Sequence, residues 1–432
     1  MHRTWMAVGL VLFLGSATGQ VVVGDVDGDG TDDVVVTGTK GKDHFVVVDR
    51  PGNPDVVISL DRNGDGDFLD AGELDAQVFA PSTAAFGIVR IATGKGNDTV
   101  DVTLEGTLAV PRVLAIELGS GANAFAIAGT PGAQVVGGGL TIDVTGSSKS
   151  DVVAFDFAAI ACDDASIALR FGGGSGVDDL TVDLGALAGA TIVDLDADLG
   201  KKNDVALLRK SGTWSGGATV SLALEGNAGN DEVRCELTDG LQDDAQLELR
   251  VSLSSGNDVF ETFVDAATFD VTSATESARV RLRGTGGSGR DSLILNTALT
   301  VGTIALQGAI DVDFRGESED DTITFDLDAP QALGFGAGGD ALLRLRLDGG
   351  AGNDLIHTNL SNDASGVPAY DVELRGDAGA DQLTYGAQNA TPGGNTAANY
   401  PPRGAMFIDG GEGEDGGFAF GNAFDMEVVR VP

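Results

Sequence analysis

A short turn of the form GxGxD recurs about every 27 residues from Asp43 to Asp415, and this repetition limits the possible folds more than any other feature. The Asp position falls at Asp43, Asp98, Asn123, Asp151, Asp178, Asp204, Asp231, Asp258, Asp291, Asp321, Asp354, Asp381 and Asp415. Glycine accepts positive φ without steric cost, and Asp or Asn can bond to the neighbouring backbone. The pattern therefore predicts a series of tight turns.

A strand is expected after each turn. Apolar residues stand two, four and six positions after the Asp, as in Val100, Val102 and Leu104, with polar residues between them. A second alternating segment, such as SIALRF or QLELRVSL, precedes the next turn. Alternation with period two is typical of strands with one buried face, and no segment shows a helical period of useful length. Each repeat is thus predicted to be strand, variable loop, strand and turn.

Repetition of a two-strand unit predicts the architecture. One unit cannot bury its apolar face alone, whereas stacked copies form a continuous core. We therefore expect an all-β fold, a parallel β-solenoid or β-helix of about 12 layers, over residues 86–432. Residues 20–85 are expected to form an N-terminal region continuous with the solenoid. A tandem array of β-sandwiches is the alternative, because the sequence does not show whether paired strands run parallel or antiparallel.

Residues 1–19 predict export. They combine a short basic start, the apolar stretch MAVGLVLFLG and small residues near Gly19, which is the pattern of a cleaved signal peptide. We expect a protein that is secreted or held at the cell surface. No later segment has the roughly 20 apolar residues that span a bilayer. The remaining chain carries 25 basic and 66 acidic side chains, which disfavours nucleic acid and anionic membranes as partners.

Only two cysteines occur, Cys162 and Cys235, about three repeats apart. At about 4.8 Å per stacked strand the two residues would lie on the order of 14 Å apart, which is too far for a disulfide. We expect free, largely buried thiols.

The sequence GDVDGDGTDD predicts a calcium site. Asp25, Asp27, Asp29 and Asp33 stand at positions one, three, five and nine of a loop with Gly30 at position six, and the carbonyl of Thr31 would serve position seven. Ca²⁺ binds six to eight oxygen ligands, and alternate acidic residues around a glycine bend can supply them. The segment resembles the FG-GAP type of calcium loop of bacterial surface proteins and integrin-like propellers, but it occurs once here.

A second acidic loop, DRNGDGDFLDAGE, resembles an EF-hand or dockerin-type loop. Asp61, Asn63 and Asp65 stand at positions one, three and five, and Asp67 offers a backbone oxygen. Position twelve is Gly72 and the closing acid, Glu73, comes one place late. Ca²⁺ is the expected ion in this loop also.

The repeated turns, among them GKGND, GAGND and GEGED, resemble the RTX or haemolysin-type calcium repeat GGxGxDxUx. In that family, stacked turns hold Ca²⁺ between layers of a parallel β-roll. The resemblance implies further calcium ligands at Asp98, Asp178, Asp231, Asp258, Asp291, Asp354 and Asp381. This chain departs from the family in its period, about 27 residues instead of nine, so that one edge of each layer carries the turn.

Stacking supplies an independent argument about that edge. Carboxylates about 5 Å apart repel by on the order of 3 kcal/mol at an effective dielectric near 20. Bound Ca²⁺ would relieve the repulsion. Outward basic side chains such as Arg90, Arg250 and Arg346, eight residues before a turn Asp, are the alternative. A third possibility is that each Asp caps its own turn in water.

These features favour a calcium-binding, secreted or cell-surface repeat protein with a structural or adhesive role. Its expected partners are Ca²⁺ and extracellular polysaccharide or cell-surface components. We expect no enzymatic activity, because only His44 and His357 remain after export and neither a zinc site nor a Ser-His-Asp arrangement is evident. A carbohydrate-active β-helix enzyme, such as a polysaccharide lyase or epimerase using pairs like Asp313 and Arg315, is the alternative.

Overall fold

The expected signal segment, residues 1–19, lies outside the residues that the computed structural model describes. The chain divides into two compact units, residues 1–201 and 202–432. The described residues are 20–50, 55–70, 73–81, 86–265, 267–272, 278–297, 303–327, 332–335, 342–360, 369–385, 404–413, 415–419 and 426–428.

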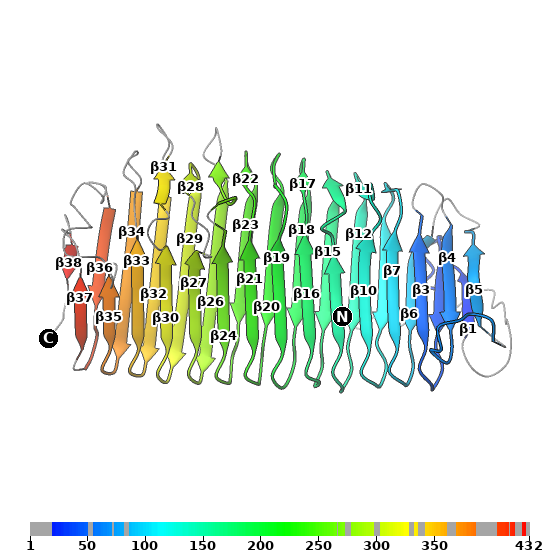
Figure 1. The fold of residues 1–432 in the computed structure, drawn as a ribbon, viewed down its shortest axis with the longest axis horizontal. Helices are drawn as coiled ribbons and strands as arrows, with labels where there is room; N and C mark the ends of the chain where they lie inside the picture. The colour runs from blue at the N-terminus through cyan, green and yellow to red at the C-terminus, as the bar shows by residue number, and fades with distance from the viewer. Residues whose placement is uncertain are drawn as a thin grey trace. The chain divides into compact units, whose positions relative to one another are not determined.

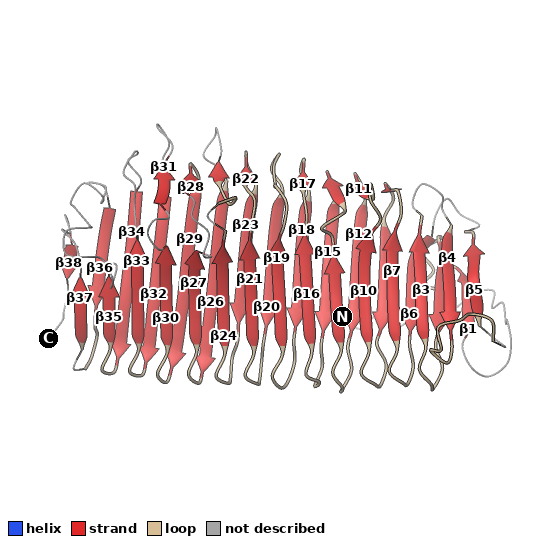
Figure 2. Cartoon of the chain, viewed as in Figure 1, coloured by secondary structure: helices blue, strands red, loops and turns tan. Residues whose placement is uncertain are grey.

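Both units are built from strands, turns and loops, and the described residues contain no helix (Figure 2). In this part of the chain there is accordingly no apolar helix of membrane-spanning length. Strands of successive repeats lie side by side within each unit (Figure 1). The predicted all-β class is confirmed.

The first unit has three sheets, which are called its first, second and third sheets. The first sheet has the order β1 (Gln20–Gly24), β2 (Asp32–Thr37), β6 (Phe86–Ala92), β9 (Arg112–Glu117), β12 (Gly139–Thr145), β15 (Ser166–Gly172) and β18 (Ile192–Asp198). The second has β16 (Asp179–Leu184), β13 (Val152–Asp156), β10 (Ala124–Gly129), β7 (Thr99–Leu104), β3 (His44–Asp49), β4 (Val56–Asp61) and β5 (Leu74–Phe79). The third has β17 (Leu187–Ala188), β14 (Ala161–Asp163), β11 (Gln134–Val136) and β8 (Thr107–Leu108).

The second unit repeats this arrangement. Its first sheet has β20 (Thr219–Glu225), β23 (Gln246–Ser252), β26 (Arg279–Ser288), β29 (Ala309–Ser318), β32 (Leu342–Ala351), β34 (Ala369–Ala378), β36 (Gly404–Asp409) and β38 (Met426–Val428). Its second has β37 (Gly416–Ala419), β35 (Gln382–Tyr385), β33 (Leu355–Leu360), β30 (Thr322–Leu327), β27 (Ser292–Thr297), β24 (Val259–Val264), β21 (Glu232–Leu237) and β19 (Val205–Lys210). Its third has β22 (Leu241–Gln242), β25 (Val271–Thr272), β28 (Thr303–Leu306) and β31 (Ala332–Phe335).

Neighbouring repeats pair in parallel, as β7 with β10 and β29 with β32 do. Each unit is therefore a parallel β-solenoid, and the predicted fold is confirmed, with the count of about 12 layers an approximation. The β-sandwich alternative would require antiparallel pairing between repeats, whereas the repeats in the described part of the chain pair in parallel. Antiparallel pairs occur at the N-terminal side of the first unit, where β1 pairs with β2, β3 with β4 and β4 with β5.

The register places equivalent apolar residues of successive repeats in one row inside the solenoid. Val100 pairs with Phe125, Phe125 with Val153, and Val153 with Leu180, and each of these side chains is buried. The position two residues after the turn residue thus always faces inward, as the alternation predicts. Because a one-residue slip would turn the whole row to solvent, the apolar pattern fixes the register.

The N-terminal region shares the sheets of the repeats. β2 pairs in parallel with β6, and β3 with β7. Cys162 and Cys235 are free and buried, as expected. Burial raises the pKa of each thiol to about 12, so both are inert thiols at neutral pH.

Candidate metal centre

The first acidic loop connects the antiparallel strands β1 and β2. The Asp25 carboxylate accepts hydrogen bonds from the N–H groups of Gly28 (2.7 Å) and Gly30 (3.1 Å). Both glycines have positive φ, 82° and 91°, which residues with a side chain rarely adopt. The sequence forms this loop because glycine stands at the two positions where the backbone must turn left-handed.

Three carboxylates converge in this loop. Oxygen atoms of Asp25, Asp27 and Asp29 lie within 4.8 Å of one another. Two ligands on opposite sides of a Ca²⁺ ion at 2.3–2.6 Å would be about 5 Å apart, so this span suits ligands of one ion. The hydroxyl and N–H of Thr31 both donate to Asp29 and lower its pKa, which keeps this carboxylate ionised. The three carboxylates could supply part of the six to eight oxygen ligands of one Ca²⁺ ion, and calcium at this loop stays a prediction.

Asp33 has a different role from the other acids of this loop. Its side chain is buried, and its carboxylate accepts the N–H of Val26 (2.8 Å) and the N–H of Ile88 on β6 (3.0 Å). Burial raises its pKa, which these two bonds oppose. The structure thus brings together Asp25, Asp27 and Asp29, while Asp33 ties the loop to the next strand of the sheet.

The second loop connects β4 and β5 and has the same hydrogen-bond pattern as the first. Asp61 accepts the N–H groups of Gly64 (2.6 Å) and Gly66 (2.9 Å), the residues three and five positions later. Burial raises the pKa of Asp61, but these backbone donors and Asn63 outweigh it and leave the pKa lowered. Two loops separated by three strands therefore share this hydrogen-bond pattern, because Asp and Gly have the same spacing in both.

The polar side chains of the second loop are arranged differently from those of the first. The Asn63 amide donates to Asp65 (3.0 Å) and Asp70 (2.8 Å), and the Asp67 carboxylate accepts the N–H of Leu69. Glu73 accepts the N–H groups of Arg62 and Asp70. Gly72 lies outside the described residues. Glu73 therefore closes the loop through backbone bonds, and calcium at this loop stays a prediction.

The turn Asp residues form a continuous ladder inside each unit. The N–H of each donates to Oδ1 of the equivalent residue in the next repeat, as Asp231 does to Asp258 (2.7 Å) and Asp321 to Asp354 (2.8 Å). The same bond joins the pairs Asp43–Asp98, Asp98–Asn123, Asn123–Asp151, Asp151–Asp178, Asp204–Asp231, Asp258–Asp291, Asp291–Asp321, Asp354–Asp381 and Asp381–Asp415. All of these side chains are buried except that of Asp415, which is half-buried, so the ladder is an internal feature of the turns and not a solvated edge.

The second carboxylate oxygen of most ladder residues in the second unit faces a glycine. In the second unit, Oδ2 is buried without a hydrogen-bond partner at Asp231, Asp258, Asp291, Asp321, Asp354, Asp381 and Asp415. At each of these residues except Asp258, which follows Leu253, the residue five positions earlier is a glycine, and a Cβ there would collide with this oxygen, as at Gly349 before Asp354 and Gly376 before Asp381. This second glycine is visible in the sequence, although the predicted turn motif included only the glycine two residues before the Asp. Calcium at the ladder stays a prediction.

Burial is the largest cause of the shifted pKa values of the ladder carboxylates. It raises the pKa of Asp231 and Asp354 to about 6 and that of Asp258 and Asp321 to about 7. Asn123 shows what a neutral group does at this position. Its amide donates to the carbonyls of Gly119 (3.3 Å) and Gly121 (3.1 Å) and to Oδ1 of Asp151 (3.0 Å).

We expect the free energy of unfolding to increase as the pH falls from 8 to 5. The folded-state pKa values of these ladder residues lie above the unfolded value near 3.9, so the folded state binds protons between about pH 7 and pH 4 that the unfolded chain does not. The stabilisation is gained as the pH falls through the folded pKa and is lost as it rises. Urea unfolding at pH 5 and pH 8 measures it.

Asp321→Asn provides the control for this pH dependence. The amide keeps the Oδ1 acceptor and removes one titrating group, so the variant should be more stable than the natural protein at pH 8, with a smaller difference at pH 5. A free energy of unfolding that increases as the pH rises from 5 to 8 would contradict proton uptake by the buried ladder carboxylates.

The arginines expected to neutralise the ladder pair with other acids. Arg90 pairs with Glu117 on the neighbouring strand β9, Arg250 with Glu248, and Arg346 with Glu373. These pairs lie on the outer faces of the first sheets, whereas the ladder lies in the turns. These arginines therefore do not neutralise the ladder carboxylates.

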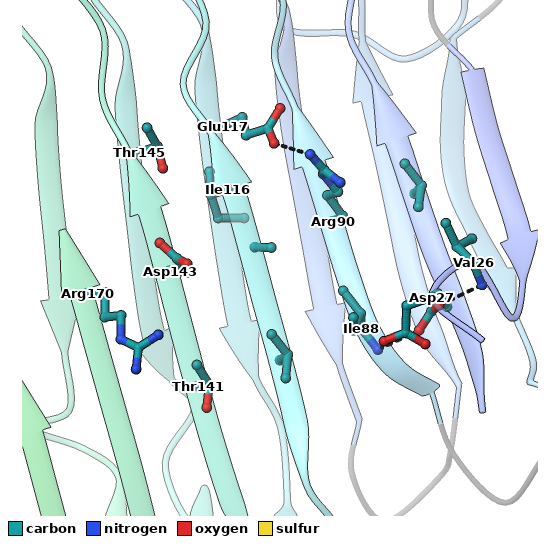
Figure 3. A pocket seen from close by; sticks show the side chains of 14 residues that line it. Val26, Asp27, Ile88, Arg90, Ile116, Glu117, Thr141, Asp143, Thr145 and Arg170 are labelled. Carbon is teal, nitrogen blue, oxygen red and sulfur yellow. Dashed lines mark hydrogen bonds and ion pairs between the residues drawn. The ribbon is translucent and has the colours of Figure 1, made fainter. Parts of the chain in front are cut away.

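A groove of about 420 Å³ borders the first loop on the outer face of the first sheet. Asp27 and Ile88 lie at one end, Arg90 and Glu117 come next, and Asp143 and Arg170 follow (Figure 3). The outward side chains of the sheet form its floor, among them Val35, Val113 and Ala115. Asp27 therefore belongs to both the acidic cluster and this groove.

No family model matches the sequence, and no curated protein or solved structure shows significant similarity to it. The fold and the site described above are therefore the basis for assigning a function.

Proposed function

We propose that this protein is a secreted or cell-surface, calcium-binding β-solenoid with a structural or adhesive role. The convergence of Asp25, Asp27 and Asp29 on a span that suits one ion carries the calcium part of the proposal. The signal-like residues 1–19 support export, and the repeated architecture supports a structural role.

Calcium at the first loop would act on the N-terminal end of the solenoid. The loop joins β1 to β2, and Asp33 bonds it to β6, so an ion that orders the loop would also hold the first strands of the sheet. Without an ion, three carboxylates lie close together and repel one another. Ordering of the loop and relief of the carboxylate repulsion would both increase the free energy of unfolding, so Ca²⁺ should stabilise the folded protein.

Excess Ca²⁺ is expected to raise the temperature of unfolding relative to chelator. A ligand that binds only the folded state stabilises it by about 2.7 kcal/mol at a concentration 100 times its Kd. Differential scanning calorimetry, with bound calcium measured by isothermal titration calorimetry, tests this. Asp27→Asn/Asp29→Asn should remove most of the shift, whereas Asp75→Asn, an exposed acid on β5, should leave it unchanged. An unfolding temperature insensitive to Ca²⁺, with no ion bound, would refute the calcium proposal.

A carbohydrate-active enzyme is the second candidate. A hollow of about 140 Å³ on the second unit is lined by Asp313, Arg315, Arg346, Asp348 and Arg375, among others. Burial, followed by the neighbouring Asp377, raises the pKa of Asp348 to about 6, which suits a group that exchanges protons near neutral pH. Depolymerisation of an acidic polysaccharide, lost in Asp348→Asn, would favour this candidate over the structural role.

A further inference from the structure

The turns of the two units carry opposite exposed charges. All five lysines of the first unit lie in its turns with exposed side chains, and they are Lys40, Lys42, Lys95, Lys149 and Lys201. None of these ammonium groups belongs to an ion pair of the described residues. We call the exposed side of these turns the lysine edge. It comprises residues 39–42, 93–97, 119–122, 147–150, 173–177 and 199–201.

No acidic residue occurs in the lysine edge. Its other side chains are those of Ser, Thr, Asn, Ala, Val and Leu, and the remaining positions are glycine. On the adjoining ends of the strands, the exposed acids are Asp179, Asp198 and Glu117, of which Glu117 pairs with Arg90. The five lysines therefore exceed the exposed acids around them.

Four turns of the second unit carry acids at equivalent places. We call their exposed side the acidic edge, and it comprises residues 316–320, 349–353, 376–380 and 410–413. These turns contain no basic residue and five acids, Glu317, Glu319, Asp320, Asp377 and Glu412. Arg290 of the preceding turn pairs with Asp320 at 3.0 Å. The flanking arginines, Arg315 and Arg375, pair with acids of their own strands, so the exposed charge of this edge is negative.

The buried ladder does not account for the difference between the edges. It lies beneath both of them and consists of Asp in both, apart from Asn123. In the turns of the lysine edge, its acids Asp43, Asp98, Asp151 and Asp178 are at most 1% exposed. Burial raises the pKa of Asp43, Asp98 and Asp151, which favours their neutral form. The edges therefore differ in the exposed residues of the turns themselves.

The charges of the two edges share one spacing, because both edges are built from turns stacked one strand apart. One turn separates Lys149 from Lys201, and one turn separates Glu317 from Asp377. At about 4.8 Å per strand, each of these pairs spans about 10 Å. Two such edges laid side by side can therefore bring successive opposite charges together.

We propose that the lysine edge of one copy of this chain binds the acidic edge of a second copy. An anionic polymer would use only the lysine edge, and a cation would use only the acidic edge. A second copy uses both, and its turns have the required spacing without any further partner. Because the two edges are different surfaces of the chain, the same contact can recur from copy to copy.

The contact is held by charge and is weak. Exposed ion pairs contribute little individually, and an edge one turn wide buries less surface than a stable dimer does. Copies with a formal charge of −40 also repel, but charges are screened beyond about 8 Å at physiological salt, so the charges at the edges dominate at contact. Association is therefore expected where copies are concentrated.

This inference deepens the structural role proposed above, because it gives that role a means of lateral assembly. It does not depend on calcium at the acidic loops. The experiment is therefore done in chelator, so that a failure of the calcium proposal and a failure of this inference are seen separately.

Sedimentation velocity of the full chain measures the association, from about 5 to 500 μM protein at 150 mM and 1 M salt. The expected result is a sedimentation coefficient that rises with protein concentration at 150 mM salt. It should stay constant at 1 M salt, where charges are screened beyond about 3 Å.

Glu317→Lys/Asp377→Lys/Glu412→Lys should weaken association by about tenfold or more. Each substitution adds two positive charges, so the formal charge changes from −40 to about −34. If general repulsion between copies controlled association, this variant would associate more tightly. The matched variant Asp75→Lys/Asp163→Lys/Asp194→Lys changes the charge equally at exposed positions outside the turns and should associate at least as well as the natural protein.

Lys95→Glu/Lys149→Glu/Lys201→Glu should also lose association. Lys40 and Lys42 are kept in this variant, because the stem of Lys42 lies against Gly64 of the second acidic loop. A 1:1 mixture of the two edge variants should associate again, because the reversed edge of each complements the reversed edge of the other. Circular dichroism confirms that each variant remains folded.

A natural chain that stays monomeric at 150 mM salt and 500 μM would overturn the inference. It would also be overturned by equal association of the acidic-edge variant and its matched variant, or by a mixture that does not recover. Association that appears only when Ca²⁺ replaces the chelator would assign the contact to bridging metal ions instead. Binding of polygalacturonate by a monomeric chain, lost in the lysine variant, would assign the lysine edge to an anionic polymer.

Discussion

Arg112→Met is expected to lower the free energy of unfolding by about 3 to 5 kcal/mol. Arg112 begins β9 and is fully buried against Asp49 at the end of β3, with Nε 2.9 Å from Oδ2 and Nη2 donating to Oδ1 at 3.2 Å. It also donates to the carbonyl of Phe86 (3.1 Å). Burial raises the pKa of Asp49 and Arg112 opposes the rise, so removal of the arginine leaves a buried acid without its partner.

Arg50→Met is the matched control. Arg50 follows Asp49 in sequence and pairs with Glu105 at 3.0 Å, but both side chains are largely exposed. An exposed pair contributes about 0 to 1 kcal/mol, so this substitution should have little effect in guanidinium chloride unfolding. Arg112→Met/Asp49→Leu, which removes both charges, should recover part of the loss. Equal effects of Arg112→Met and Arg50→Met would contradict a structural role for the buried pair.

Lys210→Met should destabilise the second unit by about 3 kcal/mol or more. Lys210 ends β19 with its ammonium inside the solenoid, where Nζ donates to the carbonyls of Gly212 (2.7 Å), Thr238 (2.8 Å) and Asp239 (3.0 Å). Nζ also lies 5.0 Å from the ring of the buried Trp214. Burial lowers the pKa of Lys210 to about 7, but three acceptors match the three N–H bonds of the charged form.

Methionine keeps most of the lysine stem, so the substitution isolates the lost donors from a change in packing. Lys149→Met, at an exposed position in a turn of the first unit, is the control and should change stability by no more than about 0.5 kcal/mol. Thermal unfolding followed by Trp fluorescence measures the stability of both variants. Trp214 reports directly on the surroundings of Lys210, because its ring lies next to Nζ. A Lys210→Met protein as stable as the natural one would show that the three carbonyls find other donors.

The register of the main strands could be predicted because turn and alternation are both local. Val100, Val153 and Leu180 take their inward positions from their distance to the preceding turn Asp, whatever lies in the next repeat. The short strands of the third sheets could not be predicted, because two to four residues carry no alternation. The antiparallel pairing of β4 with β5 could not be predicted from the apolar alternation either, since antiparallel and parallel strands can show the same alternation.

The convergence of Asp25, Asp27 and Asp29 follows from their spacing around Gly28 and Gly30, so the sequence was sufficient there. The ladder bonds join residues about 27 positions apart, and no local pattern shows which oxygen a distant N–H will meet. The buried position of Lys210 could have been predicted from the sequence. This residue stands six residues after Asp204, at an inward position, and a basic residue in an apolar row implies buried acceptors.

The antiparallel strands at the start of the first unit also bear on how copies of this chain behave at high concentration. A parallel solenoid that ended in a bare strand would offer a ready template for another chain and could grow into a fibre. Here β1 covers one sheet with reversed direction, and on the other sheet β4 runs opposite to β3, and β5 runs opposite to β4. The outermost pair is irregular, with a register shift between Ile58 and Leu60 and positive φ at Ala76. This end therefore resists the end-to-end polymerisation that a regular repeat would otherwise invite.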